Sequence, residues 1–302
     1  MRVRATLTAV LAAAALAAVA CGESNIASSS TASAVPGFLV VEAQNSMLLV
    51  GLDRVGVALF SSDRKAVNGA TGVTLTIDGP GAAVPEQRPL EYIGPEYGSI
   101  PVYLGTARFP AAGRYRYVID ATLPGGVHAT GQANVDVTTK SPSLPVGFQV
   151  PAARQHILGE PGVTLAQLDS GVPKPDDWHT ATIADGLAQH RPMVLYFGQP
   201  GFCQTQTCGP TVQVLEKLCA QYCDKLLFEH IEVNFPAGPT GKAPENPVFT
   251  AFGFQSEPWV YFVNAQGVVA DRFEGPVTIG ELRSAADGTL AGHVPAVDVA
   301  TG

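Results

Sequence analysis

Short runs of β-branched and aromatic residues alternate with turn-forming residues in the first half of the chain. Such runs occupy residues 56–60, 73–77, 102–104 and 115–119, and Asn-Gly, Asp-Gly-Pro and Pro-Gly-Gly sequences separate or follow them. Apolar positions show no helical period here, so the pattern predicts strands joined by tight turns. We therefore expect residues 37–140 to form an all-β sandwich.

The predicted sandwich resembles immunoglobulin-like domains in the spacing of its strands. It contains no cysteine, so no disulfide joins its two sheets. No group of residues within it suggests catalysis. Two interpretations stay open for this part of the chain. It is either a module that binds or presents a partner, or a spacer that holds a second domain away from a membrane.

A proline-rich stretch follows at residues 141–177. Its six prolines predict an extended linker that wraps on one of the domains. At its end the chain reads Asp176-Asp177-Trp178-His179, which contains residue types that are common at chemical sites. Because these residues end a proline-rich segment, we expect them to be solvated.

From residue 178 the pattern changes to alternating helices and strands. Thr182, with an acidic residue three positions later, fits a capped helix start, and residues 210–223 carry apolar side chains at helical spacing. This order predicts an α/β domain with a central mixed sheet over residues 178–290. The other expected elements are strands at 193–197, 226–235, 259–263 and 268–273, helices at 248–252 and 278–286, and a tail at 291–302.

The N-terminus has the pattern of a bacterial export signal. Two arginines precede an uncharged apolar run from Ala5 to Ala20, which predicts a signal peptide over residues 1–20. Small residues lead to Cys21, and this junction resembles the lipobox of lipoproteins, which implies lipidation of Cys21. A Ser- and Ala-rich tether at 21–36 follows. We expect a protein that is lipid-anchored at the outer side of the cell membrane, or periplasmic or extracellular if the signal is a plain one.

Composition narrows the class of partner. Hydrophobic residues make up 46% of the chain and charged residues 15%, which is enough apolar material for packed cores. The formal net charge of −8 argues against nucleic acid, because phosphate binding requires concentrated Lys and Arg. The expected partners are therefore proteins, together with the membrane that the lipid would enter.

Cys203 and Cys208 lie between a predicted strand and the start of a predicted helix. Later, Glu257-Pro258 precedes an apolar hairpin. Over residues 180–290 this arrangement resembles thioredoxin-fold proteins, which place a cysteine pair at a helix start opposite a cis-proline. The chain has four residues between its cysteines where the family usually has two. By this resemblance, the redox pair is Cys203 and Cys208, and the substrate contacts are Phe202, Glu257 and Pro258.

The chemistry of thiols supports a redox site at this position. A helix N-terminus favours a thiolate, which is the form that attacks disulfides. We expect Cys203 to be the nucleophile and Cys208 the resolving thiol in exchange with exported proteins or a dedicated redox partner, without an organic cofactor. A carboxylate at Glu257 would oppose the thiolate, and Leu195 and Tyr196 occupy the region of the family's buried acid, so the direction of electron flow is open. The competing interpretation is an inert disulfide.

Four cysteines remain after the lipidation site, and they allow three pairings. If residues 210–223 form one helix, Cys208 lies about 16 Å from Cys219. Disulfides span about 7 Å at most between Cα atoms, which leaves Cys203–Cys208 and Cys219–Cys223. The second pair is a structural disulfide if the helix end relaxes, or otherwise two free thiols or a second functional site.

Copper delivery is the competing function. Some thioredoxin-fold relatives bind copper with two cysteines and a distant histidine, so the chain could instead be a metal-delivery or adaptor lipoprotein. His190 lies just before the predicted strand at 193–197 and His230 lies within the predicted strand at 226–235, but neither has a diagnostic metal-site spacing. No metal ligand is therefore assigned, and His230 is interpreted as a hydrogen-bonded core residue.

The loop at 236–247 is rich in proline and glycine and is long for its position. If the strand at 226–235 runs parallel to the strand at 193–197, both end on the cysteine side of the sheet. The loop then either forms a lip beside Cys203 or is a surface insertion without a role.

Overall fold

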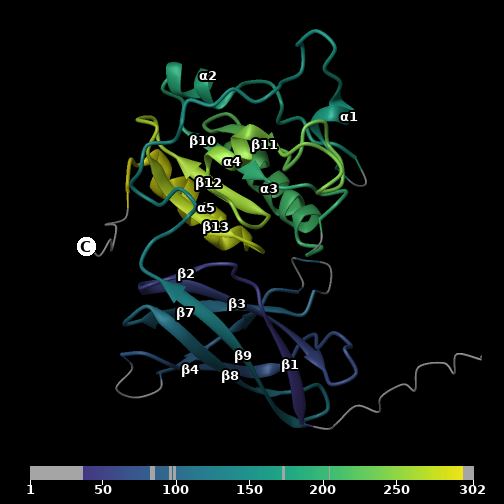
Figure 1. The fold of residues 1–302 in the computed structure, drawn as a ribbon, viewed down its shortest axis with the longest axis vertical. Helices are drawn as coiled ribbons and strands as arrows, with labels where there is room; N and C mark the ends of the chain where they lie inside the picture. The colour runs from purple at the N-terminus through teal and green to yellow at the C-terminus, as the bar shows by residue number, and fades with distance from the viewer. Residues whose placement is uncertain are drawn as a thin grey trace, which may run out of the picture. The chain divides into compact units, whose positions relative to one another are not determined.

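The structure is a computed structural model that describes residues 37–81, 86–94, 97, 100–171, 174–203 and 205–294. The described residues fall in one compact unit, which is mostly β-sheet with few helices (Figure 1). The predicted signal peptide, Cys21 and the tether up to residue 36 lie outside the described residues, as does the tail from residue 295. Among the helices of the described part, none is both long and apolar enough to cross a membrane.

The described residues between 38 and 138 form nine strands. They pair in the order β5-β4-β8-β9-β1-β3-β7-β6, with β2 added to β9. Strands that are distant in this order still share one core, because Val57, Leu75 and Tyr117 are all buried in the same cluster. The predicted β-rich domain is therefore present. Its strands are β1 (Phe38–Ala43), β2 (Leu48–Leu49), β3 (Gly51–Ser61), β4 (Thr71–Asp78), β5 (Glu86–Pro89), β6 (Glu91–Tyr92), β7 (Val102–Phe109), β8 (Gly113–Thr122) and β9 (His128–Thr138).

The strand periodicity is clearest in β8. Tyr115, Tyr117, Ile119 and Ala121 alternate with more exposed residues and are nearly fully buried, as the two-residue period of a half-buried strand requires. The aromatic side chains pack on Phe109 of β7, and the Phe109 and Tyr115 rings meet edge to face at 5.2 Å. The strand extends beyond the predicted residues 115–119 because its pairing with β9 continues over its whole length.

The proline-rich segment lies along the α/β part of the chain. Backbone N–H groups of Leu144, Gly147 and Val150 donate to carbonyls of residues 252, 269 and 267. The segment therefore wraps on one domain, as the sequence predicts, and it contains the short helix α1 (Leu165–Leu168). Gly253, at φ +73°, lets the chain pass here, since a Cβ at this position would overlap the Pro142 carbonyl.

Four strands form a mixed sheet in the order β11-β10-β12-β13. The two central pairs explain the position of the site: β10 runs parallel to β11 and antiparallel to β12. The carboxyl ends of β10 and β11 therefore lie at the same edge, as predicted. The strands are β10 (Met193–Phe197), β11 (Leu227–Ile231), β12 (Trp259–Val263) and β13 (Val269–Glu274).

Helices pack against this sheet and complete its core. Leu215 and Leu218 of α3 share a cluster with Val194, Val260 and Leu282, so α3 and α5 cover the same face. Thr182 caps α2 and Thr278 caps α5, each with a reciprocal acidic residue three positions on. The helices are α2 (Ile183–Ala188), α3 (Cys208–Tyr222), α4 (Pro247–Ala251) and α5 (Ile279–Leu290).

Candidate functional site

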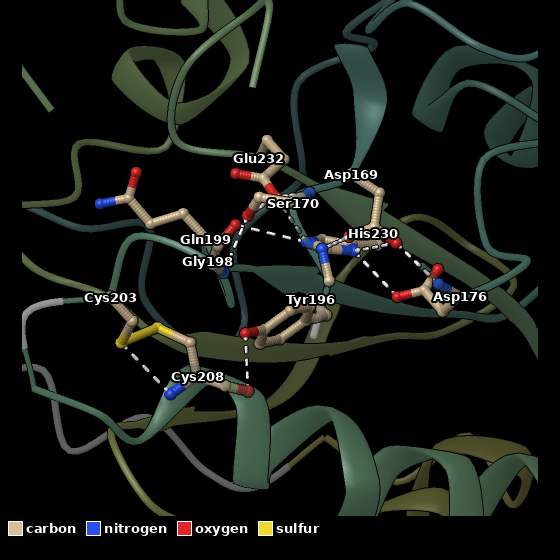
Figure 2. Close-up of polar contacts among 12 residues, drawn as sticks. Asp169, Ser170, Asp176, Tyr196, Gly198, Gln199, Cys203, Cys208, His230 and Glu232 are labelled. Atoms are coloured by element: carbon tan, nitrogen blue, oxygen red, sulfur yellow. Dashed lines mark hydrogen bonds and ion pairs between the residues drawn. A yellow bond between two sulfur atoms is a disulfide. The ribbon is translucent and has the colours of Figure 1, made fainter. Parts of the chain in front are cut away.

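The disulfide Cys203–Cys208 lies between β10 and α3, with 6.0 Å between its Cα atoms (Figure 2). Cys208 is the first residue of α3 and is fully buried, whereas Cys203 is partly exposed. The Cys208 N–H donates to Cys203 Sγ at 3.3 Å, and the Tyr196 hydroxyl donates to the Cys208 carbonyl at 3.0 Å. Cys203 therefore presents the sulfur that a partner can reach.

The Glu257–Pro258 peptide is cis, as the resemblance to thioredoxin-fold proteins implied. A carboxylate oxygen of Glu257 and the two sulfur atoms all lie within 4.8 Å of one another. The Gln199 amide donates to the same carboxylate at 3.2 Å. The structure thus brings Glu257 and, through it, Pro258 to the cysteine pair. Phe202, the remaining predicted contact, is 39% exposed directly before Cys203.

We predict that Glu257→Gln makes reduced Cys203 more reactive. A carboxylate beside a thiol disfavours the thiolate, and the amide removes that charge at nearly constant shape. Alkylation of Cys203 by iodoacetamide at neutral pH should become about threefold faster or more. The rate is measured by mass spectrometry of the reduced protein.

The matched control for this prediction is Glu216→Gln, since Glu216 is an exposed carboxylate on α3. It should leave the alkylation rate unchanged. An equal or slower rate in Glu257→Gln would show that the carboxylate does not act on the thiol.

A second disulfide joins Cys219 and Cys223 at the other end of α3, with 4.6 Å between the Cα atoms. The Cys223 N–H still donates to the Cys219 carbonyl at 2.9 Å, so the helical turn persists. The expectation that the helix end must relax is therefore wrong. Cys223 is exposed and Cys219 half-buried, and the pair is the natural control for the first disulfide.

A buried group of two aspartates and two histidines lies beside the cysteine site. Asp169 follows α1, Asp176 and His179 precede α2, and His230 lies on β11. None of the four is more than 7% exposed. The expectation of a solvated linker end is therefore wrong for Asp176 and His179, and the reason is their pairing with a strand residue some 50 positions later, at His230.

Ion pairs hold the four side chains together. His179 Nε2 lies 3.3 Å from Asp169 Oδ2 and 3.2 Å from Asp176 Oδ1. His230 Nδ1 lies 2.9 Å from Asp176 Oδ2 and 3.7 Å from Asp169 Oδ2. His230 was interpreted as a hydrogen-bonded core residue, and that prediction is confirmed. No local sequence pattern links it to residues 169–179.

The charges in this group stabilise one another. Burial alone would lower the pKa of His230, but the Asp176 and Asp169 carboxylates raise that pKa well above its ordinary value. Burial alone would raise the pKa of Asp176, but both histidines hold it far below its usual range. The same pairing lowers the pKa of Asp169 against the effect of its burial. A network of charged side chains is thus built into the interior.

Backbone groups and a third acid surround this network. Asp169 accepts from the N–H groups of Gly171 and Asp176, and Asp176 accepts from the N–H of Trp178. Glu232 accepts from the backbone and hydroxyl of Ser170 through Oε1. The pKa of Glu232 is raised, mainly by its burial. Its Oε2 has no hydrogen-bond partner within the described part of the chain.

Tyr196 connects the charged network to the disulfide. Its ring centroid lies 4.7 Å from that of His230, and its hydroxyl reaches the Cys208 carbonyl (Figure 2). The sequence analysis placed Leu195 and Tyr196 in the region where thioredoxin-fold proteins carry a buried acid. Here the acids come instead from the segment before α2 and from Glu232, directly after β11.

The loop at 236–247 lies at the cysteine end of the sheet. The Gln199 amide donates to Thr240 Oγ1 at 2.8 Å and also to Glu257. Asn234 donates to the Gly238 carbonyl and to Gln199, which fixes the start of the loop. The loop is therefore tied to the site through Gln199, and a direct lip over Cys203 stays a prediction.

Comparisons with known proteins assign no family to this chain. No family model matches it and no curated protein matches it. A superoxide reductase (neelaredoxin) from Ignicoccus hospitalis is similar at 11% identity over 34% of this chain and 82% of that one, with a TM-score of 0.23. A PKD domain of an M14-like peptidase from a Thermoplasmatales archaeon gives 19% identity, 34% and 97% coverage and a TM-score of 0.21. The PKD1 domain of the Vibrio cholerae metalloprotease PrtV is 15% identical over 34% of this chain and 98% of that one, with a TM-score of 0.18. With TM-scores this low, none of these likenesses carries a functional argument.

Proposed function

We propose that this protein catalyses thiol–disulfide exchange through Cys203 and Cys208 on a thioredoxin-like domain. One observation carries the proposal: an accessible sulfur and a buried sulfur form a disulfide at the first residue of a helix, next to a residue that precedes a cis-proline. An inert staple does not require this asymmetry of exposure. An exchange site does, because one sulfur must meet the substrate and the other must be kept from it.

The exchange balances as two successive displacements. A substrate thiolate attacks Cys203 Sγ, the Cys203–Cys208 bond breaks, and Cys208 Sγ leaves with the electron pair. A second substrate thiolate attacks the substrate sulfur of the mixed disulfide, and Cys203 leaves as a thiolate. Two electrons pass from the substrate dithiol to the protein disulfide, and the protons of the two substrate thiols go to the new protein thiols or to solvent. The reverse sequence reduces a substrate disulfide.

The helix start supports a thiolate at Cys203. The Cys208 N–H points at Cys203 Sγ, and the Thr205 hydroxyl lies 3.3 Å from the same sulfur. Both groups, together with the positive end of α3, favour negative charge at this atom. Glu257 opposes them, so the site combines a stabilising helix terminus with a carboxylate that weakens its effect.

A small groove borders Thr205 and Glu257, the two side chains that lie near the sulfur atoms, and offers a place for a substrate segment. It has a volume of about 200 Å³. Thr205 and Glu257 line it together with Asn45 and Ser46 of the β-rich part. The Ser46 N–H donates to Glu274 at the end of β13, which fixes that wall. The β-rich part thereby acquires a role in the proposal, because it forms one wall of the substrate groove.

The proposal includes an extracytoplasmic location with a lipid anchor on Cys21. Two disulfides in the described residues support an oxidising compartment. The sequence of residues 1–21 supports export and acylation. Mass analysis of the mature N-terminus in the native host tests the anchor, and an unmodified Cys21 would refute it.

The test of exchange uses the oxidised protein and a reduced peptide that contains two cysteines. Formation of the peptide disulfide, followed by alkylation and mass spectrometry, should proceed with the unchanged protein and fall to the uncatalysed rate in Cys203→Ser. The double variant Cys219→Ser/Cys223→Ser should retain the full rate, because that disulfide lies at the far end of α3. Exchange that survives Cys203→Ser, or none in the unchanged protein, would refute the proposal.

A second candidate function is copper delivery by the reduced cysteines. Two sulfurs and a carboxylate oxygen within 4.8 Å of one another form a set that could bind a soft ion such as Cu(I). Copper that binds the reduced protein and is lost in Cys203→Ser, without turnover of the peptide, would favour this function over exchange.

A further inference from the structure

The buried network beside the disulfide has the composition and spacing of a metal site. Two imidazole nitrogens and two carboxylates converge there, and one atom from each residue lies within 4.8 Å of the others. Zinc is bound at about 2.0–2.1 Å by His nitrogen and 2.0–2.2 Å by Asp oxygen, so the edges of its tetrahedral site are about 3.3 Å long. The nitrogen–oxygen distances in the network are 3.3, 3.2, 2.9 and 3.7 Å.

We propose that Asp169, Asp176, His179 and His230 form a binding site for one divalent transition-metal ion, with zinc the best match. Two carboxylates balance the charge of such an ion when both imidazoles are neutral. Four protein ligands make a closed site, which is typical of structural rather than catalytic zinc. The proposal is independent of the exchange function, because it uses none of the cysteines.

The surroundings of the four side chains are those of metal ligands. His230 Nδ1 faces the carboxylates while its Nε2 lies 3.3 Å from the Gly198 carbonyl, an arrangement that orients a ligating imidazole. Asp169 and Asp176 each accept hydrogen bonds from backbone N–H groups. These hydrogen bonds hold both carboxylate groups in place. These contacts fix the ligand atoms before any ion arrives.

A pocket borders this group. Its volume is about 590 Å³, and it is lined by Asp169 and Asp176 together with Gly209, Val212 and Lys217 of α3. Asp169 and Asp176 therefore border the pocket and also pair with the histidines. A bound ion would connect the segment from residue 169 to residue 179 with β11. It would thereby hold His230 against Tyr196, which donates to the Cys208 carbonyl.

The experiment uses the full chain with both disulfides intact, freed of metal by a chelator and then given zinc or cobalt chloride. We expect one ion per chain to stay bound after desalting. Cobalt should show the intense visible bands of a tetrahedral site without sulfur-to-metal charge transfer. X-ray absorption of the zinc form should show only nitrogen and oxygen at about 2.0 Å, with imidazole scattering and no sulfur at about 2.3 Å.

Variants assign the ligands. Asp176→Asn and His179→Gln should weaken zinc binding about a hundredfold or more. His128→Gln is the matched control, because His128 is an exposed histidine that lies 3.8 Å from Asp120 on the β-rich part. The double variant Cys203→Ser/Cys208→Ser should keep the ion, which separates this site from the exchange site.

Three results would overturn the proposal: no retained ion, sulfur in the coordination shell, or equal affinity in the two ligand variants and the unchanged protein. The X-ray absorption measurement on the unchanged protein decides the question even if a ligand variant fails to fold.

Discussion

Asp176→Asn is expected to lower the free energy of unfolding by about 3 kcal/mol in chelator-treated protein, because it breaks a buried charge network. Asp176 is 7% exposed and pairs with both His179 and His230. The asparagine keeps the acceptor for the Trp178 N–H but leaves the two histidines with Asp169 as their close counter-charge. The loss is measured by denaturant unfolding at neutral pH, where the carboxylate is ionised.

Asp136→Asn is the control for this experiment. Asp136 also pairs with a cation, Arg114, but both side chains are mostly exposed on the β-rich part. Exposed ion pairs contribute little, so this variant should unfold almost as the unchanged protein does. If Asp176→Asn unfolded like the unchanged protein, the buried ion pairs would contribute no net stability.

Local patterns predicted most of the elements that position the cysteines. The capping residues Thr182 and Thr278 start helices as expected, and β10 and β12 coincide with the predicted strands. Helix rise and the reach of a disulfide bond excluded pairing across the length of α3 and left Cys203–Cys208, whereas the bridge between Cys219 and Cys223 was one of three open alternatives. These features depend on short-range chemistry, which a single sequence records. The strand expected at 226–235 ends at Ile231, because the residues after it turn into the loop instead of pairing with β10.

The charged network was missed because its signal is not local. A polar residue is stable in a core only when its partner lies there too, and the partner of Asp176 is on β11. The flanking prolines are typical of a solvated linker, so they favoured the wrong environment. The aromatic Trp178, which is buried against Phe228, was the one nearby residue that indicated burial.

The difference in burial between the two sulfurs indicates which one meets the substrate. Cys208 is fully enclosed at the start of α3, and Cys203 is partly open to solvent beside an exposed phenylalanine. A substrate can therefore form a mixed disulfide with Cys203, while Cys208 is placed to attack that sulfur from inside the protein. Resolution within the protein is fast because the attacking thiol is already held at the reacting bond.

Cys208→Ser should therefore trap the mixed disulfide. Incubated with oxidised glutathione, this variant should accumulate an adduct on Cys203 that persists at least about a thousandfold longer than in the unchanged protein whose Cys203–Cys208 bond has first been reduced, because the internal attacker is gone. Intact-protein mass spectrometry without reductant follows the adduct, and peptide mapping locates it. Cys203→Ser is the reciprocal control: its remaining thiol, Cys208, is buried and should stay unmodified under the same conditions. An adduct that forms faster on Cys208 than on Cys203 would reverse the two roles, and a short-lived adduct in Cys208→Ser would show that some other group resolves it.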